Sequence, residues 1–210
     1  MKNTALSLPR FYLFRFSDPT VTISLLLAAM AAIAAAGIIG AIAAKRFDGN
    51  KKQTALCFMA ITAAIAALLC CFFGSAAAVV KGILFSLILL SSSYTDLKTR
   101  ECADHIHLLI ATAAFIGTDV TAFPKMLLSA IIVTALVLLA IAVTKGKLGG
   151  ADVKLSSACA FLLGIHRALA GLAGGLLLAA LTETLLKKKK QEGFPLIPYL
   201  AAGFMAAYFI

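Results

Sequence analysis

MLLSAIIVTALVLLAIAVTKGKLGGADVKL, residues Met126 to Leu155, contains the two features that decide the fold of this chain. Met126 to Val143 is an almost unbroken apolar run, and a basic, glycine-rich break that carries Asp152 follows it. Such a run indicates a helix that crosses a hydrocarbon core of about 30 Å, which takes about 20 residues. The short alternating segments of a membrane β-barrel do not occur in the sequence.

The same pattern of apolar run and polar break repeats along the chain. The 210 residues are 62% hydrophobic, whereas a soluble domain has about 45–50% apolar residues. The apolar runs are Val21–Ala44, Thr54–Phe73, Ala76–Leu90 with an extension to Tyr94, Ile106–Gly117, Met126–Val143, Leu155–Ile165, Ala168–Leu186, and a last run that Gly193 and Pro195 open and that reaches Ile210. We therefore predict an all-α, polytopic transmembrane helix bundle of about eight spans. Residues 1–36 could instead be a cleaved signal peptide, but the length of the first run favours a retained helix.

The fourth and sixth runs are shorter than a span requires, and each adjoins an aspartate. Their helices could continue through polar residues into a wet or protein-lined cavity, where a charge at membrane depth is tolerated. Alternatively, the bilayer could be thinner there, or neighbouring helices could be tilted. The sequence leaves both explanations open.

The formal net charge of +10 comes from basic residues that cluster at the ends of the apolar runs. The positive-inside rule and binding to anionic lipid headgroups explain these clusters better than nucleic acid, for which no binding motif is present. We place the strongest basic loops in the cytoplasm: Lys45–Lys52, Asp96–Asp104, Lys145–Lys154 and Lys187–Glu192. We therefore expect a multi-pass protein of the plasma membrane.

Two of the nine acidic residues, Asp96 and Asp152, directly adjoin apolar helices on the same predicted side. Asp96 lies in SYTDLKTRECADHIH (Ser93 to His107), and two apolar runs separate it from Asp152. An even number of crossings returns both carboxylates to one face. A carboxylate near the hydrocarbon boundary is costly unless it is paired or wet, so this pair is the candidate functional site. The other acids have simpler explanations in loops or, for Glu183, an ion pair with Lys187.

The residues around Asp152 leave two interpretations open. Gly149, Gly150 and Ala151 remove side-chain bulk, so that a second helix or an extended peptide could lie against the segment. Alternatively, the glycines only break the chain and Asp152 caps the sixth helix. Lys154 could lower a carboxylate pKa or bind lipid phosphate, but a lysine that snorkels to the interface is the favoured role. We expect no metal, because His105 and His107 lie on different sides of a helix.

GGADVKL, Gly149 to Leu155, closely resembles the second aspartate motif of the type IV prepilin peptidases, which are membrane aspartic proteases. YTDLKTRECADHI (Tyr94 to Ile106) resembles the first motif, and IPYLAAG (Ile197 to Gly203) resembles the closing segment. The three motifs occur in family order. Two departures are Ala151, where the family has glycine, and Cys102-Ala103-Asp104, where it has Ile-Pro-Asn.

The resemblance implies a six-helix catalytic core over residues 75–210, preceded by a tail and two helices over residues 1–74. It implies an aspartic endopeptidase that cleaves the basic leader from prepilins or pseudopilins at the cytoplasmic membrane face, with Asp96 and Asp152 as catalytic residues. Gly149, Gly150, Ala151 and Lys154 would support the motif or bind substrate, without a cofactor. N-methyltransferase activity is not expected, because only Lys45–Gln53 occupies the place of the zinc-binding insert. The alternative function is a transporter, channel or assembly subunit that uses intramembrane carboxylates.

Overall fold

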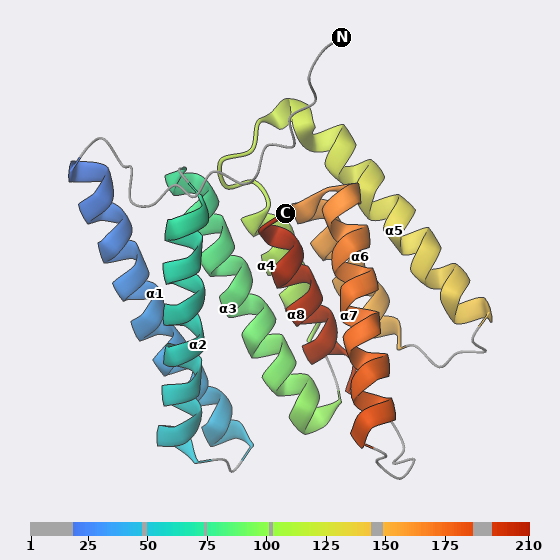
Figure 1. Ribbon diagram of the computed structural model, residues 1–210, viewed down its shortest axis with the longest axis horizontal. Helices are drawn as coiled ribbons and strands as arrows, with labels where there is room; N and C mark the ends of the chain where they lie inside the picture. Colours follow the sequence, from blue (N-terminus) through green and yellow to red (C-terminus); the bar gives the residue numbers. More distant parts are fainter. Residues whose placement is uncertain (1–18, 48–49, 74, 101–102, 144–148, 187–194) are drawn as a thin grey trace.

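A computed structural model describes residues 19–47, 50–73, 75–100, 103–143, 149–186 and 195–210. These residues form eight α-helices and one short 3₁₀ turn, η1, and none of them lies in a strand. The elements are α1 (Pro19–Arg46), α2 (Lys51–Phe72), α3 (Ala76–Thr99), α4 (Asp104–Ala113), η1 (Val120–Ala122), α5 (Phe123–Val143), α6 (Gly150–Leu163), α7 (Ile165–Leu186) and α8 (Ile197–Tyr208). The predicted all-α bundle is confirmed (Figure 1).

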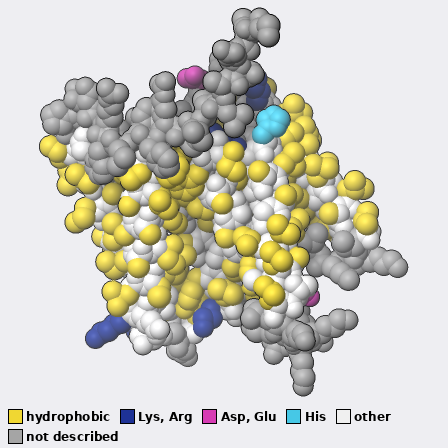
Figure 2. Space-filling model, viewed as in Figure 1, with side chains coloured by type: hydrophobic (Ala, Val, Ile, Leu, Met, Phe, Trp, Pro, Cys, Tyr) yellow, Lys and Arg dark blue, Asp and Glu magenta, His cyan; other side chains and the backbone are white. Residues whose placement is uncertain are grey.

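Five of the helices, α1, α2, α3, α5 and α7, are long and apolar enough to cross a membrane. Their outward side chains are large and apolar, as at Leu27, Leu139 and Leu177. Figure 2 shows apolar side chains over the middle of one face and the charged side chains at its upper and lower margins. This distribution is that of a multi-pass membrane protein. The helices α4, α6 and α8 are shorter, with 10, 14 and 12 residues.

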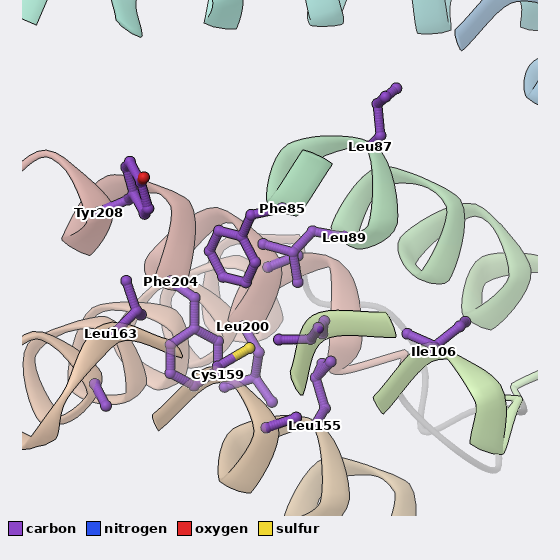
Figure 3. Packing of buried hydrophobic residues seen from close by; sticks show 14 of the residues in the cluster. Phe85, Leu87, Leu89, Ile106, Leu155, Cys159, Leu163, Leu200, Phe204 and Tyr208 are labelled. Atoms are coloured by element: carbon purple, nitrogen blue, oxygen red, sulfur yellow. The ribbon is translucent and has the colours of Figure 1, made fainter. Parts of the chain in front are cut away.

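Of the short helices, α6 and α8 are mostly buried among their neighbours, whereas α4 exposes Leu108 and Leu109. α1 packs along α2 and α3 on one side of the molecule, and α5 packs along α6 on the other. α8 lies between them and contacts α3, α6 and α7, while α4 contacts α3 and α6. Figure 3 shows the apolar core where these elements meet, with Phe85 and Leu89 from α3, Leu155 and Cys159 from α6, and Leu200 and Phe204 from α8.

Close glycine packing joins α7 to α8. A Cβ atom added to Gly203 of α8 would lie 2.8 Å from Gly175 Cα of α7, and closer still to the Gly171 carbonyl oxygen. Gly171 and Gly175 are four residues apart on α7 and therefore share a face. Small residues at this spacing let two membrane helices approach until their backbones touch. The position of α8 beside α7 thus depends on the absence of side chains.

The structure corrects several predicted boundaries. Asp96 and Asp152 lie within the helices α3 and α6, although the sequence pattern placed both in polar breaks. The gap between the runs Leu155–Ile165 and Ala168–Leu186, where a turn is predicted at His166 and Arg167, belongs to the first turn of α7, and the chain turns at Gly164, whose φ is 79°. The basic clusters at Lys145–Lys147 and Lys187–Lys190, and the ion pair predicted between Glu183 and Lys187, involve residues outside the described ranges.

Candidate active site

Asp96 lies in the last turn of α3, and its side chain is only 6% exposed. The predicted break does not occur there, because the hydroxyl groups of Ser91, Ser93 and Thr95 donate to carbonyl oxygens three or four residues earlier in the helix. Polar residues that satisfy their hydrogen bonds in this way can remain helical. The helix ends at Arg100, which adopts a left-handed conformation with φ 57°. Asp96 thus has a rigid support.

A hydrogen bond from another part of the chain orients the Asp96 carboxylate. The backbone N–H of Ile197, the first residue of α8, donates to Asp96 Oδ2 over 3.2 Å. The N–H groups of a first helical turn lack partners within their own helix and are available to a carboxylate. Pro198 follows at the second position, where the missing N–H of proline costs nothing. The closing IPYLAAG segment therefore directly supports the first aspartate.

Asp152 lies in the first turn of α6 and is 8% exposed. Its Oδ2 accepts a hydrogen bond from the Gly149 backbone N–H over 3.0 Å, and its own N–H donates to the Gly149 carbonyl oxygen over 3.1 Å. The alternative interpretation of Asp152 as a helix-capping residue is therefore correct as a description of its local bonding. The contact uses Oδ2 and leaves Oδ1 for other partners, so capping does not exclude a chemical role.

Burial and the Gly149 hydrogen bond have the largest influence on the Asp152 carboxylate, and the charge of Asp96 adds a smaller one. α4 and α8 contact both α3 and α6, whereas the described backbones of α3 and α6 do not contact each other directly. The aspartates therefore face one region of the bundle from two separate helices. The expectation that both carboxylates return to one face fits this arrangement, and their pairing as catalytic residues stays a prediction.

Lys154 forms an ion pair with Asp104, with Nζ 2.6 Å from Oδ1. This pair joins the start of α6 to the start of α4, at the same end of the bundle as the aspartates. The side chain of Lys154 is 58% exposed, so the favoured prediction that it snorkels to the interface stays a prediction, and the ion pair with Asp104 is an additional contact. Sequence reasoning placed Asp104 in the basic loop Asp96–Asp104 and missed this pairing, because its partner is 50 residues away.

The small residues before Asp152 differ in their surroundings. A Cβ atom on Gly149 would lie 3.4 Å from Asp152 Oδ2, while one on Gly150 would meet no described atom within 4 Å. Ala151 packs against the apolar core. The space beside Gly150 is consistent with the predicted room for a second segment. Cys102, one of the two departures from the family pattern, lies outside the described residues.

Sequence reasoning did not predict the burial of polar atoms in two further side chains, Ser156 on α6 and His107 on α4. Ser156 follows Asp152 by one helical turn and is fully buried, and its hydroxyl group has no described partner. His107 on α4 has two buried ring nitrogens without described partners, and the charges of Asp104 and Lys154 act on it. The signal for Ser156 was the i,i+4 spacing, which puts it on the same helix face as Asp152. No three His, Cys, Asp or Glu residues gather as a metal site within the described ranges.

A polytopic membrane protein with two buried carboxylates at one end of its bundle is the class that the fold and the site define. The model of the type IV leader peptidase family matches residues 83–186, a range that contains both aspartates. The chain belongs to this family, as the motifs indicated, and it is a leader peptidase-like membrane protease. No curated protein and no solved structure matched the chain.

Proposed function

We propose that the protein is an aspartic endopeptidase that removes basic leader peptides from prepilins or pseudopilins at the cytoplasmic face of the membrane. The observation that carries this proposal is the placement of two buried aspartates, Asp96 and Asp152, at one end of the bundle and inside the region that matches the peptidase family. The substrate would be a small membrane protein with a basic leader and an apolar helix.

The proposed mechanism uses the two carboxylates as one coupled group. Two neighbouring carboxylates do not both ionise easily, so the pair holds one shared proton. The ionised member takes a proton from a water molecule, which attacks the scissile carbonyl carbon. The protonated member donates a hydrogen bond to the carbonyl oxygen and later supplies a proton to the departing amine. The Ile197 and Gly149 N–H groups hold the two carboxylates in orientation.

The distribution of charge supports a cytoplasmic site. Lys45, Arg46, Lys51 and Lys52 flank the turn between α1 and α2. This turn lies at the Asp96 end of α3, because the rings of Phe47 and Tyr94 lie 6.1 Å apart. Basic residues concentrate on the cytoplasmic side of membrane proteins. A basic leader would lie at the same face, and the short turn suits a peptidase without N-methyltransferase activity.

The test is cleavage of a candidate prepilin in membranes that contain the full chain. Asp96→Asn and Asp152→Asn should each lower the rate of leader removal by at least about 100-fold, because each removes one partner of the acid–base pair. Asp119→Asn is the matched control, since Asp119 is exposed next to η1 and lies outside both aspartate motifs. It should cleave at the wild-type rate. The cleaved product should retain an unmethylated N-terminal amine by mass spectrometry.

Two results would contradict the proposal. Normal cleavage by both aspartate variants, at normal expression, would exclude the proposed catalytic pair. A proton flux across the membrane that both variants lose, without any cleavage by the wild type, would favour the transporter.

A further inference from the structure

The end of the bundle opposite the aspartates contains a polar cavity of about 170 Å³. The first turns of α3 and α7 and the last turn of α8 surround it, near the C-terminus marked in Figure 1. Lys81, Arg167, Tyr208 and Ser75 supply its polar lining. We call this cavity the Lys81–Arg167 pocket. Two cations at this end need a physical explanation, because the aspartates lie at the other end of the bundle.

Lys81 is partly buried, and its described hydrogen-bond partner is a neutral hydroxyl group. Lys81 Nζ donates to Thr118 Oγ1 over 2.6 Å, and Thr118 Oγ1 in turn donates to the Ala114 carbonyl oxygen over 2.8 Å. An ammonium group has three donors. Two of them therefore remain for a further acceptor, and the Thr118 contact holds the amine at the cavity.

Arg167, in the first turn of α7, supplies the second positive charge. Its side chain is exposed, and its charge acts on the phenol of Tyr208. The Tyr208 hydroxyl group donates to the Ala78 carbonyl oxygen over 2.7 Å, which holds the ring in place. The pocket lining contains no carboxylate, and neither cation has an ion-pair partner within the described residues. Asp119, the carboxylate next to Thr118 in sequence, is exposed and does not line the pocket.

We propose that the Lys81–Arg167 pocket binds a phosphate group, as carried by an anionic phospholipid. A partly buried cation without a counter-ion is unfavourable, and an anion would satisfy it. A guanidinium group binds phosphate oxygens in a bidentate manner, and an ammonium group adds a point charge. The pocket lies at the ends of membrane helices, at the level of lipid headgroups.

The test is lipid binding by the purified full chain in neutral detergent, measured by native mass spectrometry. Dioleoyl-phosphatidylglycerol is titrated in one series and dioleoylglycerol, which lacks the phosphate, in a second. Inorganic phosphate is tested separately through the melting temperature. The wild type should retain the phospholipid and not the diglyceride. Lys81→Gln and Arg167→Gln should each weaken its binding about tenfold, as expected for the loss of a hydrogen bond to a charged group.

The matched control is Lys125→Gln, which removes an exposed cation near the start of α5, outside the pocket lining. It should bind phospholipid as the wild type does, and Lys81→Arg should restore most of the binding. Protection by inorganic phosphate that both glutamine variants lose would support the same site with a free anion as the ligand. Wild-type binding in folded Arg167→Gln protein, or equal losses in Lys125→Gln, would overturn the proposal. Arg167 is exposed, so its replacement does not threaten the core.

Discussion

Each aspartate of the candidate site depends on one backbone N–H group for its orientation. Ile197 provides this group for Asp96, and Gly149 provides it for Asp152. The two donors differ in origin, because Gly149 is local whereas Ile197 belongs to a distant helix. The identity of the two side chains alone therefore does not fix the orientation of their carboxylates. Its geometry also requires α8 to begin at one particular place.

The ion pair between Lys154 and Asp104 should give stability a defined pH dependence. The hydrogen bond and charge of Lys154 hold the pKa of the Asp104 carboxyl below its usual range. A carboxylate with a lowered pKa stabilises the fold above the usual value of about 3.9, and this contribution disappears as the pH falls through the lowered pKa. We expect Lys154→Gln to lower the melting temperature slightly at pH 7, with no difference from the wild type at strongly acidic pH.

The control for this measurement is Lys98→Gln, because Lys98 lies 5.9 Å from the ring centroid of Tyr94 and forms no described ion pair with a carboxylate. Its effect on the melting temperature should not depend on pH in this way. A Lys154→Gln effect that stays constant down to acidic pH would show that the pair does not stabilise the fold.

At the scale of elements, the contact between α7 and α8 positions the donor for Asp96. α8 has only 12 residues, and the glycine contact fixes it against the longer α7. The same helix contacts α3 and α6, which carry the two aspartates. A displacement of α8 would therefore disturb the surroundings of both aspartates. The closing motif IPYLAAG thus has a structural role, because it begins α8 at the position that supports Asp96.

Gly203→Ala should disturb this contact and the site together. The added methyl group would meet the backbone of Gly171 and Gly175, which cannot move aside as a flexible side chain could. Overpacking of this kind costs about 1–3 kcal/mol. We expect a lower melting temperature, and slower leader cleavage because Ile197 moves away from Asp96.

Gly174→Ala is the control, because a methyl group there would meet no described atom within 4 Å. Alanine is also the better helix former, by up to about 1 kcal/mol. Its stability and cleavage should equal or exceed those of the wild type. Equal behaviour of the two variants would mean that the glycine contact does not position α8.

For the whole molecule, the two ends of the bundle have different chemistry. The Asp96 end carries the paired carboxylates and the basic turn between α1 and α2, while the opposite end carries the Lys81–Arg167 pocket. Exposed apolar helix faces lie between the ends (Figure 2). The orientation of the whole bundle therefore decides which side of the membrane the two aspartates face.

Cysteine labelling in intact cells tests this orientation. In a background with Cys57, Cys70, Cys71, Cys102 and Cys159 replaced, Asn50→Cys should react with a membrane-impermeant maleimide only after permeabilisation. Val120→Cys, at a side chain that is 85% exposed near the opposite end, should react in intact cells. The physical reason is the excess of basic residues beside Asn50. The reverse pattern would place the aspartates outside the cytoplasm.

The sequence by itself determined the helical membrane architecture and the choice of Asp96 and Asp152 as candidates. Run lengths, charge clusters and motifs are local properties, and two intervening apolar runs already imply that both carboxylates return to one side. The boundary at Asp96 was wrong, because its hydroxyl-bearing neighbours continue the helix by bonding to their own backbone.

Only the tertiary structure decided how the carboxylates are supported. Ile197 lies 101 residues from Asp96, and Lys154 lies 50 residues from Asp104. Such contacts depend on where separate helices end relative to one another, which hydrophobic spacing along one chain does not specify. The close approach of α7 and α8 is likewise a tertiary property. A glycine indicates such a contact only when the backbone of a second helix is known to lie against it.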